Sequence, residues 1–169
     1  MEQHEVHRLA LKNQYAFSDW TRARHQASAP LERPFLPDHA LLRGYRLAGR
    51  TAVPGTRSAF TDYLQSESDG AVTVAVSIEA LPNNAAARER LVDHLARCMS
   101  PRVQRLTEAG IEAGDVGFGG GPQGDAPLFF LRGNVVVELH NTGTRRASLA
   151  EVAQTIDAQI VHLLEGLAR

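Results

Sequence analysis

The strongest constraint on the fold is a pair of apolar runs, residues 126–132 and 135–140, that flank Gly133-Asn134. A two-residue turn containing glycine between such runs predicts a β-hairpin. Strand alternation then places Leu128, Phe130, Val137 and Leu139 on one face, and Phe129, Leu131 and Val136 on the other. Because both faces are apolar, each needs a cover. The candidates for the second face are the N-terminal helix, a second subunit or a ligand.

Three further segments alternate with the period of a strand. Residues 41–48 suit an edge strand, and residues 59–65 and 72–79 flank a loop that ends in Asp69-Gly70, a pair that accepts the positive φ of a hairpin. A short strand is expected near residues 115–118. These segments predict a mostly antiparallel sheet.

Helical periodicity marks three segments. The first covers residues 1–28, with Val6, Leu9, Ala10, Ala16, Phe17 and Trp20 on one face. The second starts at Asn83-Asn84, buries Leu91, Val92, Leu95 and Met99, and ends at Pro101. The third opens with Ser148 and Glu151 as a capping box and buries Leu149, Val152, Ile156, Ile160, Leu163, Leu164 and Leu167. The resulting order α-βββ-α-βββ-α predicts an α+β fold, a two- or three-layer sandwich.

Length and charge limit the classes of protein that this chain can belong to. Its 169 residues suit one domain, comprising the helix at 1–28, a Pro-rich connector at 29–40, and a sheet with two helices at 41–169. A net charge of −1 argues against nucleic acid as a partner. No apolar stretch is long enough for a membrane span. The sequence as written predicts a cytoplasmic protein, or one outside the cytoplasm if a leader has been removed.

Residues 119–124 read Gly-Gly-Gly-Pro-Gln-Gly and match the glycine spacing of dinucleotide-binding loops. That motif requires a helix after the loop, whereas Pro122 removes one amide and a strand follows. We therefore interpret these residues as a turn-forming, mobile loop. No cofactor is predicted.

Few side chains carry chemistry in a recognisable pattern. His4 and His7 lie one helical turn apart and could share a metal ion, although two solvated histidines explain the spacing better. Glu138 and His140 project from one strand face and could form an acid–base pair, or else a half-buried salt link. Cys98 is the only cysteine, so the chain holds no internal disulfide.

The run from Leu128 to Val137, with Gly133-Asn134 at its turn and Ile156-Asp157 in the following helix, resembles bacterial sensor-type domains. The resemblance covers about sixty residues. It implies a small α/β sandwich used for binding, often outside the cytoplasm, with Asp157 on a helix surface. It implies no catalytic residue.

These observations favour a non-enzymatic binding or accessory domain that acts through a protein partner or through self-association, with a homodimer as the expected form. The residues expected to bind are Phe129, Leu131 and Val136 on the second hairpin face, with Phe17 and Trp20 as the contacts if the first helix covers that face. The alternative is a small enzyme or carrier that binds a small molecule between sheet and helices and uses Glu138 and His140.

Overall fold

The computed structural model describes residues 3–53 and 59–167. Its centre is a six-stranded antiparallel sheet in the order β1-β2-β3-β6-β5-β4. The strands are β1 (Tyr45–Ala52), β2 (Ala59–Ser66), β3 (Thr73–Ala80), β4 (Val116–Gly119), β5 (Leu128–Arg132) and β6 (Val135–Asn141). The helices are α1 (Gln3–Gln14), α2 (Asn84–Arg97) and α3 (Ala150–Leu167). The predicted fold class and element order are confirmed.

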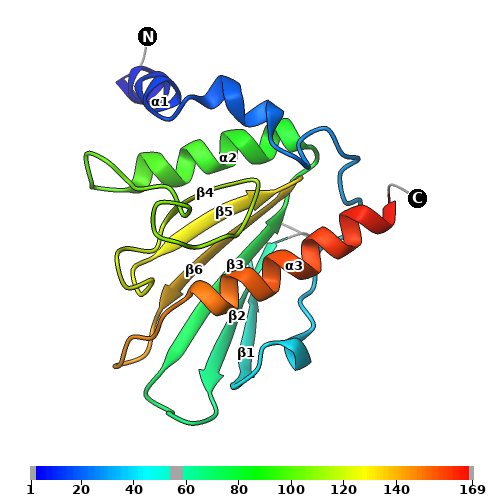
Figure 1. Cartoon of the computed structure of the whole chain (residues 1–169), viewed down its shortest axis with the longest axis vertical. Coiled ribbons are helices and arrows are strands. Elements are labelled where there is room, and N and C mark those ends of the chain that lie inside the picture. Colours follow the sequence, from blue (N-terminus) through cyan, green and yellow to red (C-terminus); the bar gives the residue numbers. More distant parts are fainter. Residues whose placement is uncertain (1–2, 54–58, 168–169) are drawn as a thin grey trace.

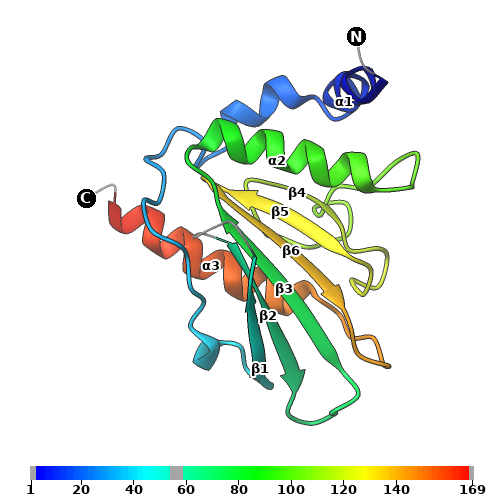
Figure 2. The same cartoon turned by 180° about the vertical axis from the view of Figure 1, so that it is seen from behind.

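Helices lie on both faces of the sheet (Figure 1). The α3 helix covers one face, where Ile156 and Ile160 pack in a core cluster with Val76 and Phe130. The α2 helix covers the β4–β5–β6 half of the other face, and α1 lies outside α2. On that side the β1–β2–β3 half of the sheet has no described helix over it (Figure 2).

The β5–β6 hairpin has the predicted register. Leu128 pairs with Leu139, and Arg132 pairs with Val135 across the turn. Gly133 has φ of 57°, a conformation that costs a residue with a side chain more than it costs glycine. A Cβ at Gly133 would also lie 3.0 Å from the Leu164 side chain, so this turn packs tightly against α3.

The second hairpin face is covered by the chain itself. Phe129, Leu131 and Val136 are 4%, 0% and 2% exposed. Their cover is chiefly α2, through Leu91, Val92 and Leu95, which the sequence analysis had assigned to the core without assigning a face. Trp20, also expected at a binding surface, is 2% exposed and packs on Phe118 at 5.7 Å between ring centroids.

The first helix is shorter than expected. α1 ends at Gln14, Ala16 takes the left-handed conformation with φ of 52°, and a 3-10 helix, η1, covers Phe17–Arg22. The apolar face was also wrong in part, because Val6 and Leu9 are 47% and 52% exposed. α1 is fixed by Leu11, which is buried in one core cluster with Leu91 of α2, and by its polar side, where Arg8 and Lys12 both bind Glu89 of α2 at 2.7 Å.

Other helix-end predictions had mixed outcomes. Asn83 caps α2 by accepting a hydrogen bond from the Ala86 amide at 2.8 Å, as predicted. Met99 is fully exposed rather than buried, because α2 ends before it. Ser148 accepts a hydrogen bond from the Ala150 amide and not from that of Glu151, so the capping-box geometry is incomplete. The Asp69-Gly70 turn forms without positive φ at Gly70.

Candidate functional site

The connector between α1 and β1 packs along α3, and we call its residues 29–41 the strap. Pro34 and Pro37 lack amide hydrogens, which keeps residues 29–38 out of regular secondary structure, and the strap ends in a short 3-10 helix, η2 (His39–Leu41). Side chains from elsewhere in the chain hold it in place. The Asn134 side chain accepts a hydrogen bond from the Leu31 backbone amide at 2.8 Å and donates one to the Leu31 carbonyl at 3.0 Å.

Towards its end the strap is fixed to both α3 and the sheet. Gln159 of α3 accepts a hydrogen bond from the Asp38 amide at 2.7 Å and donates one to the Asp38 carbonyl at 3.3 Å. His39 binds the buried carboxylate of Asp62 at 2.7 Å, and Arg50 binds the same carboxylate at 2.6 Å. The strap is therefore a preformed wall.

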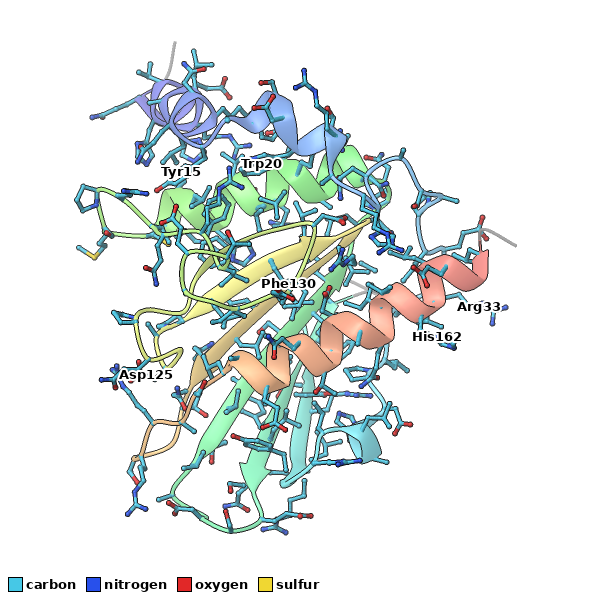
Figure 3. The ribbon with its side chains drawn as sticks, in the orientation of Figure 1. Tyr15, Trp20, Arg33, Asp125, Phe130 and His162 are labelled. Carbon is cyan, nitrogen blue, oxygen red and sulfur yellow. The ribbon has the colours of Figure 1, made fainter. Side chains whose placement is uncertain are left out.

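An apolar groove runs between the strap and α3, and we call it the strap groove. It comprises a hollow of about 720 Å³ and an adjoining hollow of about 550 Å³, which share Phe35, Leu36 and Leu163. Four leucines along it are about half exposed: Leu36, Leu41, Leu163 and Leu167, at 57%, 54%, 46% and 56%. In Figure 3, His162 is labelled on one side of α3 and Phe130 over the strands on the other side.

Acidic groups mark one part of the strap groove. Asp38 and Glu151 line the larger hollow, and within residues 3–53 and 59–167 neither carboxylate forms a salt bridge. Burial is the main cause that raises the pKa of Tyr45, and the negative charge of Glu151 raises it further. The remaining polar lining consists of Gln154, Thr155 and His162. Exposed leucines with few polar groups among them are typical of a surface that binds an apolar face of another protein.

A smaller, polar hollow of about 260 Å³ lies between α2 and the sheet, and we call it the sheet pocket. His94 of α2 lies in it with its ring stacked on Phe129, at 5.4 Å and 27°. Its Nδ1 is 3.2 Å from Glu138 Oε2, and an Arg97 Nη2 is 3.0 Å from the same nitrogen. The hydrogen bond from His94 lowers the pKa of Glu138, although burial opposes it.

The sheet pocket changes the pairing that the sequence suggested. Glu138 and His140 do lie on one strand face, but the direct partner of Glu138 is His94. His140 adds only a weaker attraction that lowers the pKa of Glu138. The proximity of His94 was missed because it comes from a helix that lies 44 residues earlier in the chain than Glu138. Such a contact leaves no local sequence pattern.

A buried ionic cluster joins the hairpin turn to α3. Arg132 donates two hydrogen bonds to Asp157, at 2.8 and 2.5 Å, and one to Asp115 at 2.9 Å. Asp157 is 5% exposed, so its expected place on a helix surface is wrong. Burial raises the pKa of Asp115, but hydrogen bonds from Gly133 and Gln26 and the charge of Arg132 outweigh it and lower that pKa. We interpret this cluster as structural, because its members satisfy one another.

The other candidates from the sequence lie outside the strap groove and the sheet pocket. His4 and His7 are exposed on α1, and no group of three metal-ligating side chains occurs in the described part of the chain. Phe17 packs on Trp20 and under the Lys12 ammonium. Burial raises the pKa of the Cys98 thiol, which disfavours a reactive thiolate.

The glycine loop at 119–124 has positive φ at Gly119, Gly120, Gly121 and Gly124. Backbone hydrogen bonds close it, including one from the Gly120 amide to the Pro127 carbonyl at 3.0 Å. A Cβ at Gly119 would lie 2.2 Å from that carbonyl oxygen, so close approach explains this glycine. β5 follows the loop, where a dinucleotide-binding loop would have a helix.

Comparison with known proteins gives this chain no relative: no family model, no curated protein and no solved structure matches it. Among the described residues no helix is long and apolar enough to cross a membrane. We therefore infer a function from the strap groove and the sheet pocket.

Proposed function

We propose that this chain is a protein-binding domain whose strap groove receives the apolar face of a helical protein segment. The observation that carries the proposal is the line of four half-exposed leucines in a groove with fixed walls. Contiguous exposed apolar surface of this kind marks interaction sites in soluble proteins.

The shape of the strap groove favours a helix as the ligand. Its lining on α3 extends from Glu151 to Leu167, which is about 24 Å along a helix axis at 1.5 Å per residue. A ligand helix of four to five turns would have about that length. Covering the exposed half of each leucine would contribute on the order of 1 kcal/mol, so several contacts are needed together.

The fixed strap favours binding in a second way. Because Asn134, Gln159 and Asp62 already hold it, closing the groove on a ligand requires little ordering of the chain. Preorganisation of this kind lowers the entropy cost of association.

The test is the fluorescence of a hydrophobic dye, 8-anilinonaphthalene-1-sulfonate, in dilute protein. We expect the wild type to bind the dye, and Leu36→Glu or Leu163→Glu to reduce binding with the fold intact by circular dichroism. Leu9→Glu is the matched control, since Leu9 is equally exposed but lies on α1. Equal loss in the control, or no binding by a wild type that is monomeric at the concentration of the assay, would contradict the proposal.

A small-molecule site is the second candidate function, and the sheet pocket favours it. A histidine held by a carboxylate at 3.2 Å is a common arrangement in acid–base chemistry. Arg97 lines the same pocket, where its charge attracts the Glu138 carboxylate without a direct ion pair between them. That guanidinium would suit an anionic ligand.

A further inference from the structure

The exposed face of α3 has a self-complementary order of side chains. From its N-terminal to its C-terminal end, the part that lines the larger hollow reads Glu151, Gln154, Thr155, Ala158, Gln159, His162 and Leu163. An acid lies at one end, an imidazole lies at the other, and two small residues lie between them. The midpoint between Glu151 and His162 falls between Ile156 and Asp157, and Leu163 lies outside this symmetric part.

Two copies of this face match when the helices run antiparallel about a two-fold axis at that centre. Glu151 of each copy then lies level with His162 of the other, and Thr155 lies level with Ala158. Glu151 and His162 are about 16 Å apart along the helix axis, so both pairs form in one straight contact. A two-fold interface requires this reciprocity, in which one patch contacts the same patch on its partner.

The centre of the face allows close approach. Thr155 and Ala158 are small, and helices packed through small side chains reach interaxial distances near 8 Å. Leu36 and Leu41 line the same hollow from the strap, so a second helix seated in it would cover them as well. The net charge of −1 gives little general repulsion between copies.

We propose that the occupant of the strap groove is α3 of a second copy of this chain, antiparallel to the first, with two Glu151–His162 pairs per dimer. This rests on the proposed function, because it names the protein that the strap groove binds. It assigns Glu151 and His162 the role of fixing orientation and register, and Leu36, Leu41 and Leu163 of the larger hollow the role of supplying affinity. Leu167 lies beyond the end of the partner helix in this pairing.

The test is sedimentation equilibrium of the full chain and of charge-reversal variants. Glu151→Lys and His162→Glu should each raise the dimer dissociation constant roughly tenfold, because two attractive contacts per dimer are lost or become repulsive. The double variant should restore the constant to near the wild-type value. Ala158→Arg should abolish the dimer, whereas Ala85→Arg, at an exposed position of α2, should leave it unchanged.

Two results would overturn this inference. A double variant that dimerises more weakly than either single variant would rule out the antiparallel pairing. A wild type that stays monomeric, while its strap groove still binds the hydrophobic dye, would mean that the ligand is a different protein. Absence of both dimerisation and dye binding would overturn the proposed function as well.

Discussion

Replacing Arg132 by methionine tests whether the buried ionic cluster holds the hairpin turn to α3. Arg132 is 13% exposed in its side chain, and its partners Asp115 and Asp157 are 0% and 7% exposed. The Arg132→Met change leaves both carboxylates buried without their cation. Breaking a buried ion pair in this way costs about 3–5 kcal/mol, so we expect a loss of that size in the free energy of unfolding at neutral pH.

The two carboxylates should respond differently. Asp115 keeps its hydrogen bonds from Gln26 and the Gly133 amide, whereas Asp157 loses its only side-chain partners among the described residues. Adding Asp157→Asn to the Arg132→Met variant should therefore recover part of the loss. The assay is urea unfolding followed by the fluorescence of Trp20, the only tryptophan, which is buried.

The pH dependence gives a second measure of the same cluster. The pKa of Asp115 is lowered in the folded protein, so its contribution to stability is present above the unfolded pKa and is lost as the pH falls through the folded pKa. Without Arg132 that pKa rises, and the difference in stability between wild type and Arg132→Met should narrow in acid. A loss of unfolding free energy below about 1 kcal/mol at neutral pH would refute the reasoning, because a solvent-exposed ion pair contributes no more than that.

Two further predictions concern α3 and the sheet pocket. Ile156→Ala should cost about 2–5 kcal/mol of unfolding free energy, since Ile156 is fully buried. Leu163→Ala, at a half-exposed site, should cost less than about 1 kcal/mol. Equal losses in urea unfolding would contradict the assignment of Ile156 to the buried face of α3 and Leu163 to the exposed face. If the sheet pocket takes an anion, adding inorganic phosphate or succinate should shift the nuclear magnetic resonance signals of the His94 ring in the wild type but not in Arg97→Gln, and unshifted signals would remove the second candidate function.

Local patterns predicted much of the fold. Alternation placed the strands within a few residues, and the register of the β5–β6 hairpin followed from Gly133-Asn134 alone. Where the prediction was wrong, the physical cause lies between distant segments. Val6 and Leu9 carry a helical apolar pattern, yet α1 packs on α2 through Arg8 and Lys12, and a hydrophobic pattern does not report such ion pairs.

The candidate site was harder to predict than the fold. Leu163 and Leu167 were assigned to the core because they extend the apolar line of α3, but that line is wider than the face that the sheet buries. The strap groove needs contact between Asp38 and Gln159, 121 residues apart. One sequence feature could have indicated an exposed apolar face on α3. Leu163 and Leu167 lie one turn apart, beside the buried pair Ile160 and Leu164.

Photo-crosslinking tests most directly whether the strap groove binds protein. A benzoylphenylalanine at position 154, in the strap groove, is compared with one at position 102, an exposed site outside it. Our account predicts a covalent adduct from position 154 that carries peptides of α3 of a second copy, with no adduct from position 102. An adduct to another protein's helix would keep the protein-binding function and reject the dimer. No adduct from position 154, or equal yields from both positions, would contradict the assignment of the strap groove as a protein-binding surface.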